Sequence, residues 1–115
     1  MANISLLGCG TWGSALAQVV AENGHRVTAW HYKKEALDIR ALSRKHPRLK
    51  GLVFHDNIHF EHDLAASLTK AQCIIVAVPS HAVRKIMLQS KPFISKKAVI
   101  VNIAKGIEND TLKTM

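Results

Sequence analysis

The feature that most constrains the fold is a glycine-rich turn, Gly8-Cys9-Gly10-Thr11-Trp12-Gly13, which directly follows the short apolar run from Asn3 to Leu7. In this G-x-G-x-x-G spacing, Gly8 permits a tight turn out of a strand and Gly10 leaves room for a pyrophosphate to approach the backbone. Gly13 lets the next helix lie close to the strand. The start of that helix offers free N–H groups and the positive end of its dipole to phosphate. The pattern predicts a dinucleotide site, with a merely structural glycine-rich turn as the alternative.

Apolar runs alternate with helix-like segments along the whole chain. The run Cys73–Val78 is continuously apolar, which is typical of a strand buried on both faces of a parallel sheet. The alternation predicts an α/β fold, a doubly wound parallel sheet (Rossmann-like) with strand order 3-2-1-4-5. All 115 residues are expected to form one dinucleotide-binding domain. Strands are predicted at 3–7, 26–30, 58–60, 73–78 and 98–103, and helices at 12–23, 33–45 (closed by Pro47), 63–70 and 80–89.

The composition narrows the choice of partners. The chain carries 16 Lys and Arg against 8 Asp and Glu, but the basic residues are dispersed and only 5% of residues are aromatic. This favours a cationic surface that attracts an anionic cofactor and substrate over a nucleic-acid interface. No apolar run approaches the roughly 20 residues that span a bilayer, and the N-terminus lacks a signal-peptide pattern. With Cys9 and Cys73 expected to be small buried residues, a cytoplasmic protein is predicted.

The histidines invite a metal hypothesis, because His55, His59 and His62 are close in sequence. His59 falls in a predicted strand and the other two fall in loops, and no cysteine lies among them. No metal site is therefore expected.

Four stretches follow predicted strands and should meet at one edge of the sheet, where ligands of such folds collect. They are Gly8 to Gly13, Trp30 to Lys34, Val78 to His81 and Ala104 to Glu108.

The stretch after the second strand bears on the choice of cofactor. No acid precedes Glu35, whereas Lys33 and Lys34 are close by, so NADP is favoured or tolerated beside NAD. The alternative is a solvated helix start. Lys105 is a positive charge expected at the same edge, able to bind a substrate phosphate or the cofactor, with a plain surface charge as the alternative.

Together these stretches resemble the N-terminal half of the bacterial-type NAD(P)-dependent glycerol-3-phosphate dehydrogenases. The matching pieces are Gly8 to Ala17, Asn23 to Val27 with Trp30, Val76 to His81, and Lys105-Gly106-Ile107-Glu108. The resemblance implies that the cofactor, NADP or NAD, is bound by Gly8, Gly10, Thr11, Trp12, Gly13, Tyr32, Lys33 and Lys105, and that Lys105 also binds the substrate.

The chain departs from this family in two places. Tyr32 stands where a His or Arg is common, which weakens the case for a strong NADP preference. In the connection from Lys45 to His55, only Leu49 and Gly51 agree with the usual N-x-x-Y-L-P-G pattern. No site is assigned to that loop.

The resemblance implies an oxidoreductase that interconverts sn-glycerol 3-phosphate and dihydroxyacetone phosphate with NAD(P)(H) and feeds glycerophospholipid synthesis. Family members continue into a helical substrate domain that supplies the catalytic lysine. No catalytic residue is therefore assigned here, the chain alone is expected to be inactive, and a homodimer through that domain is left open. A stand-alone NAD(P)-sensing module and another two-domain hydroxyacid-type dehydrogenase are the alternatives, although Trp12 and Lys105 to Glu108 argue against the latter.

Overall fold

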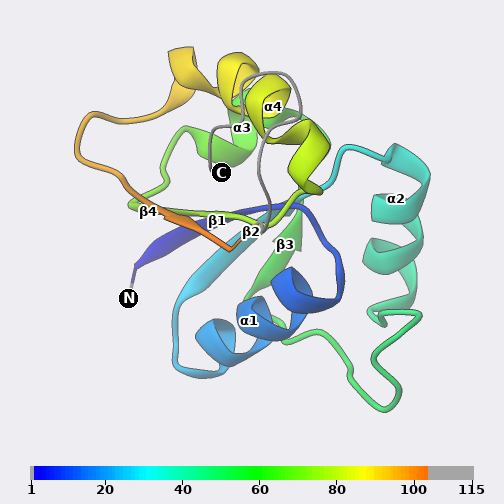
Figure 1. Cartoon of the computed structure of the whole chain (residues 1–115). Helices are drawn as coiled ribbons and strands as arrows, with labels where there is room; N and C mark the ends of the chain where they lie inside the picture. Colours follow the sequence, from blue (N-terminus) through cyan, green and yellow to red (C-terminus); the bar gives the residue numbers. More distant parts are fainter. Residues whose placement is uncertain (1, 104–115) are drawn as a thin grey trace.

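The computed structural model describes residues 2–103, which form a parallel sheet with helices on both faces (Figure 1). The strand order is β3-β2-β1-β4-β5, which confirms the predicted doubly wound sheet and its order. All four neighbouring pairs are parallel, with Leu7 of β1 level with Trp30 of β2 and Val76 of β4. The strands are β1 (Asn3–Leu7), β2 (Arg26–Trp30), β3 (Ile58–Phe60), β4 (Cys73–Val76) and β5 (Val99–Asn102).

The helices divide between the two faces of the sheet. Helices α1 and α2 lie on one face, and α3 and α4 lie on the other (Figure 1). Two short 3₁₀ turns, η1 and η2, flank α4. The bounds are α1 (Thr11–Glu22), α2 (Lys34–Ser43), α3 (Leu64–Leu68), η1 (Ser80–Ala82), α4 (Val83–Ser90) and η2 (Lys91–Phe93).

Each face of the sheet has its own hydrophobic core, as the alternation of side chains along a strand requires. Leu6 points to the face of α1 and α2, where it packs with Ala17 and Leu37. Leu7 points to the other face, where it packs with Leu68 and Ile86. β1 is therefore covered on both sides and fixes the turn that follows it.

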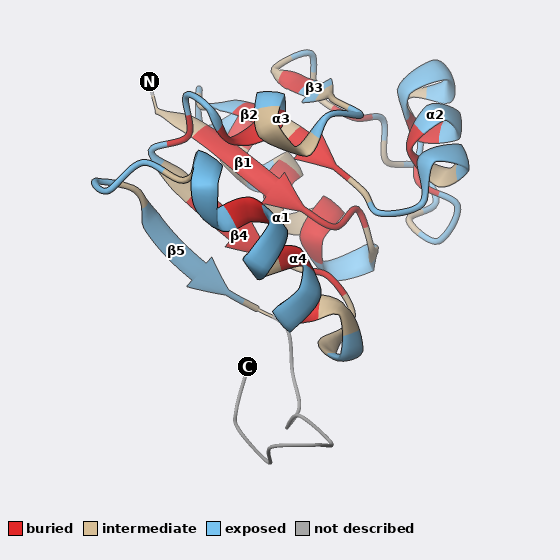
Figure 2. Cartoon of the chain, turned by 90° about the horizontal axis from the view of Figure 1, so that it is seen from above, coloured by how far each residue is buried: buried red, intermediate tan, exposed pale blue. Residues whose placement is uncertain are grey.

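The strand β5 forms an edge of this sheet and is exposed along its length (Figure 2). Its neighbour β4 and the next strand, β1, are largely buried. Among residues 2–103, no helix is both long and apolar enough to cross a membrane.

The predicted helix boundaries shift by one to three residues. One correction concerns α2, which ends two residues earlier than predicted: Arg44 follows it in a left-handed conformation at φ 59°, before Pro47 is reached. The Arg44 guanidinium donates to the carbonyl oxygens of Phe54, His55 and Ile58. These bonds stabilise an uncommon backbone conformation.

Three other boundaries moved inward for local reasons. α3 starts after Asp63, whose carboxylate accepts from the Ala65 N–H and caps the helix. The strand β4 ends at Val76, two residues earlier than predicted, ahead of Pro79, which has no N–H to donate. The helix predicted from Ser80 begins with the 3₁₀ turn η1.

Candidate functional site

The glycine turn has the geometry that its spacing predicts. Gly8 has φ +105°, and a Cβ there would lie 2.7 Å from the carbonyl carbon of Ala77. A Cβ on Gly13 would lie 2.6 Å from the Gly8 oxygen and 2.9 Å from the Ala77 Cβ. Gly10 differs, because nothing lies within 4 Å of the position of its Cβ. Two glycines therefore allow close packing, and the third keeps space open in front of the turn.

That open space belongs to a groove of about 450 Å³, here called the turn groove. It lies at the carboxyl ends of β1, β2 and β4, where a doubly wound sheet binds ligands. Three segments form its wall: the turn at 10–13, the end of β2 with His31, Tyr32 and the α2 residue Arg40, and the segment 77–80 with Ile103. The groove thus unites the stretches that the sequence placed together.

The start of α1 presents unused donors to the turn groove. Its N-cap is Gly10, which has no side chain to cap the helix. Within residues 2–103, no atom accepts a hydrogen bond from the N–H groups of Gly10, Thr11 and Trp12. Free N–H groups and the helix dipole together favour an anion at this point. The indole of Trp12 is 75% exposed at the edge of the groove, where it offers apolar surface to a ligand.

The residues after β2 form one side of the groove. His31 and Tyr32 have ring centroids 4.8 Å apart, and the Lys33 ammonium lies 5.6 Å from the Tyr32 ring centroid. Lys33 and Tyr32 are both exposed. The predicted contact residues at this end are therefore accessible, and a positive charge lies next to the aromatic ring.

Beneath the turn, the backbone of Cys9 is held by side chains from four segments of the chain. Its N–H donates to His31 Nδ1 at 2.9 Å. Its carbonyl oxygen lies 3.1 Å from each of three side-chain groups: the Ser14 hydroxyl, Arg40 Nε and His46 Nε2. The Arg48 N–H donates to His46 Nδ1, so the neutral ring carries its proton on Nε2 and donates it to the Cys9 oxygen.

Burial under the turn keeps these groups in their neutral forms. It raises the pKa of the Cys9 thiol to about 12, against a smaller opposing effect of the Arg40 charge. Burial and then the charges of Arg40, Lys33 and His46 lower the pKa of His31 to about 4. Burial and Arg40 also lower the pKa of His46. At neutral pH the cation in this cluster is Arg40.

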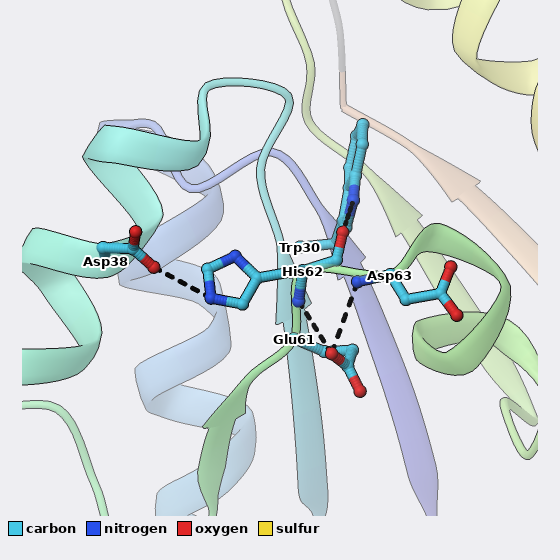
Figure 3. Close-up of polar contacts among 5 residues, drawn as sticks. All are labelled: Trp30, Asp38, Glu61, His62 and Asp63. Carbon is cyan, nitrogen blue, oxygen red and sulfur yellow. Dashed lines mark hydrogen bonds and ion pairs between the residues drawn. The ribbon is translucent and has the colours of Figure 1, made fainter.

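A second set of contacts joins the end of β2 to the loop before α3, and that loop to α2 (Figure 3). The Trp30 indole N–H donates to the His62 carbonyl oxygen at 3.0 Å. The His62 ring lies 2.8 Å from the Asp38 carboxylate. This contact joins the loop before α3 to α2. The Glu61 carboxylate accepts from the N–H groups of the two residues that follow it.

The structure brings most of the predicted site residues together. Of these, Gly10, Thr11, Trp12, Gly13 and Tyr32 line the turn groove. Gly8 supports the turn from behind, and Lys33 flanks Tyr32 without lining the groove. Lys105 lies outside the described residues.

The histidines considered as metal ligands make other contacts. His55 Nδ1 accepts from the Asn57 N–H, and His62 contacts Asp38. In the described part of the chain, no three His, Cys, Asp or Glu side chains are arranged to hold a metal ion.

Sequence reasoning missed His31, Arg40 and His46. His46 belongs to the connection to which no site was assigned, yet it reaches the Cys9 carbonyl across 37 residues. One signal was present for Arg40. It follows the buried Leu37 by three residues and therefore lies on the inward face of α2.

Comparison with known proteins agrees with this geometry. A family described as NAD-dependent glycerol-3-phosphate dehydrogenase N-terminus matches residues 3–115. Glycerol-3-phosphate dehydrogenase [NAD(P)+] 2 of Lactobacillus delbrueckii subsp. bulgaricus is 41% identical over 115 residues, which are 100% of this chain and 34% of that protein. The enzyme of Citrifermentans bemidjiense is 39% identical over 113 residues, covering 97% of this chain and 34% of that protein.

A solved structure agrees in the same way. The crystal structure of glycerol-3-phosphate dehydrogenase from Coxiella burnetii superposes with a TM-score of 0.88 at 33% identity, covering 94% of this chain and 34% of that one. The chain thus spans about one third of the length of the relatives it matches. On the family match and the shared fold, this chain belongs to the N-terminal domain family of the NAD-dependent glycerol-3-phosphate dehydrogenases.

Proposed function

We propose that residues 1–115 form the cofactor-binding unit of an NAD(P)-dependent glycerol-3-phosphate dehydrogenase. The observation that carries this proposal is the turn groove at the start of α1, where the N–H groups of Gly10, Thr11 and Trp12 have no acceptor among residues 2–103. A pyrophosphate needs these two features, donors and a backbone without a Cβ in the way. The open space in front of Gly10 meets the second need.

The groove also fits the rest of a dinucleotide. The wall of 77–80 and Ile103 lies at the ends of β4 and β5 and would receive the nicotinamide end. Tyr32 and Lys33, after β2, would receive the adenosine end. When bound, the cofactor supplies the hydride for the reduction of a carbonyl group. These side chains bind it, orient it and shield one side of it from water.

The whole reaction in this proposal is the interconversion of sn-glycerol 3-phosphate and dihydroxyacetone phosphate in the cytoplasm, with glycerol 3-phosphate serving phospholipid synthesis. Its support is the activity for which relatives about three times as long as this chain are named. Lys105 would contact both the cofactor and the substrate phosphate. The acid–base group and most of the substrate site would come from a helical domain beyond these residues, so that residues 1–115 bind the cofactor without turnover.

Calorimetric titration of NADPH and NADH into the chain tests this proposal, with Gly10→Val as the variant. Valine would place methyl groups where the pyrophosphate approaches, and Gly10 has an ordinary φ of −71° that valine also adopts. The variant should stay folded and lose binding of both cofactors by about a hundredfold. Equal affinity in the variant and the parent would contradict the site.

A rate assay tests the division of labour. The chain mixed with NADPH and dihydroxyacetone phosphate should leave the absorbance at 340 nm unchanged, because an open groove does not exclude water from the carbonyl. Steady NADPH oxidation by residues 1–115 alone would show that they contain the complete catalytic machinery.

A further inference from the structure

The guanidinium of Arg40 lies beneath the glycine turn, and no acid among residues 2–103 neutralises it. The residue is only 9% exposed, and no carboxylate in the described part of the chain lies within ion-pairing distance. Its nearest ring is that of His46, with Nη2 and Nε2 3.3 Å apart. Since the His46 ring is neutral, it provides no compensating charge. A buried cation without a carboxylate is costly unless something else at the site balances it.

The hydrogen bonds of Arg40 are directed at the backbone. Nε donates to the Cys9 oxygen, and Nη1 donates to the Ala36 oxygen one turn back on α2. The bond to Ala36 holds the guanidinium in place, and the bond from Nε anchors the Cys9 carbonyl. Ser14 and His46 donate to the same oxygen. The carbonyl is therefore fixed toward the interior by three donors on three segments of the chain.

Because the peptide bond is planar, anchoring the Cys9 carbonyl also fixes the direction of the Gly10 N–H. In a trans peptide the N–H points opposite to the C=O, and residues 2–103 contain no cis peptide. With the Cys9 oxygen directed at Arg40, the Gly10 N–H points away from the interior. That N–H has no acceptor among residues 2–103, and Gly10 lines the turn groove. A cation on the carbonyl side also polarises the peptide and strengthens its N–H as a donor.

We propose that Arg40 is a positioning residue for the cofactor pyrophosphate: it holds the Cys9–Gly10 peptide with its N–H in the turn groove and supplies the uncompensated positive charge behind it. The inference rests on the proposed function, because it takes the pyrophosphate as the anion. The charge that Arg40 lacks within the described chain would then be provided by the ligand. Arg40 acts through the peptide, and its effect should be the same for every ligand that carries a diphosphate.

Arg40→Met tests this inference, and Arg44→Met is the matched control. Arg44 is also partly buried and also donates to backbone carbonyls, those of Phe54, His55 and Ile58, but it does not line the turn groove. Dissociation constants are measured by calorimetry for NADH, NADPH and ADP on the 115-residue chain. Circular dichroism verifies that each variant is folded.

Arg40→Met should raise the dissociation constants of all three ligands by one common factor of about ten or more, as expected for a charge-assisted interaction. Arg40→Lys should recover part of the affinity, because lysine keeps the positive charge but lacks the planar set of N–H donors of the guanidinium. Arg44→Met should bind like the parent. In ¹H–¹⁵N spectra without ligand, Arg40→Met should shift the Gly10 amide resonance and Arg44→Met should not.

Three results would overturn the inference while the parent still binds: unchanged affinity in Arg40→Met, an equal loss in Arg44→Met, or a loss much larger for NADPH than for NADH and ADP. The last would assign Arg40 to the 2′-phosphate. Should Arg40→Met fail to fold, Arg40→Lys carries the test, with a several-fold common loss expected and an unchanged affinity overturning the inference. A parent chain that binds none of the ligands would instead refute the proposed function.

Discussion

Replacing Gly13 by alanine should destabilise the fold, and its cost can be worked out from the contacts. A Cβ at this position would meet the Gly8 oxygen at 2.6 Å, the Ala77 Cβ at 2.9 Å and Leu6 Cδ1 at 3.2 Å. The first contact is with backbone in a tight turn, so α1 must move away from β1. Overpacking of this kind costs roughly 1–3 kcal/mol, and a backbone clash favours the upper end.

One effect opposes this cost. Alanine is favoured over glycine within a helix by about 1 kcal/mol, and Gly13 lies in the first turn of α1. The net prediction is a loss of about 2 kcal/mol in the free energy of unfolding. Urea denaturation followed by circular dichroism measures it, with Gly10→Ala as the control. Gly10→Ala meets no atom within 4 Å and should cost less than about 1 kcal/mol as an N-cap replacement.

An unchanged or raised stability of Gly13→Ala would refute the close approach of α1 to the turn. So would an equal loss in both variants, since the argument depends on the difference between a filled and an open Cβ position.

Three further outcomes are expected. Because the pKa of His31 falls from its ordinary 6.5 to about 4, the unfolded chain binds a proton that the native chain does not, so stability should fall by roughly 2 kcal/mol as the pH drops from 7 to 4.5; urea titrations at these two pH values measure the loss, and an unchanged pH dependence in His31→Asn would refute the assignment. Because the pKa of the Cys9 thiol is about 12, a disulfide reagent at pH 8 should modify Cys73 in the native chain and reach Cys9 at a comparable rate only in denaturant; equal native rates would contradict its burial. Lys33→Ala should weaken NADPH binding more than NADH binding, by about 1 kcal/mol, if Lys33 meets the 2′-phosphate; an equal loss would leave Lys33 as a surface charge.

The fold could be predicted because local signals agreed with one another. The glycine spacing, the continuous run of β4 and the alternation of strands and helices all require the same sheet, and its order follows from where the turn must lie. The end of α2 could not be predicted from Pro47, because the bonds that hold Arg44 at positive φ come from residues 10 to 14 positions away.

The residues of the site also fall into a group that local sequence predicts and a group that only the fold brings together. The backbone of Gly10 and the side chains of Thr11 and Trp12, which line the turn groove, can be predicted from a local motif. Arg40 and His46 support that motif from 31 and 37 residues away, and only the folded chain brings them to the Cys9 carbonyl. A buried arginine on an inward helix face is the one sign of this support that sequence spacing gives.

A second cavity competes with the glycine turn as the place where a dinucleotide would bind. A cavity of about 570 Å³, larger than the turn groove, lies along the amino-terminal half of β1 and beside α3, with Asn3, Ser5 and Lys70 in its wall. Volume alone would favour it. The free N–H groups and the carboxyl ends of the strands favour the turn groove.

Titration of NADPH into the ¹⁵N-labelled chain, followed by ¹H–¹⁵N correlation spectra, decides between them. If the dinucleotide binds at the glycine turn, the amides of Gly10, Thr11 and Trp12 should shift most and in a saturable way, while those of Asn3 and Lys70 stay in place. Saturable shifts centred on Asn3 and Lys70, with the turn amides unmoved, would contradict binding at the turn.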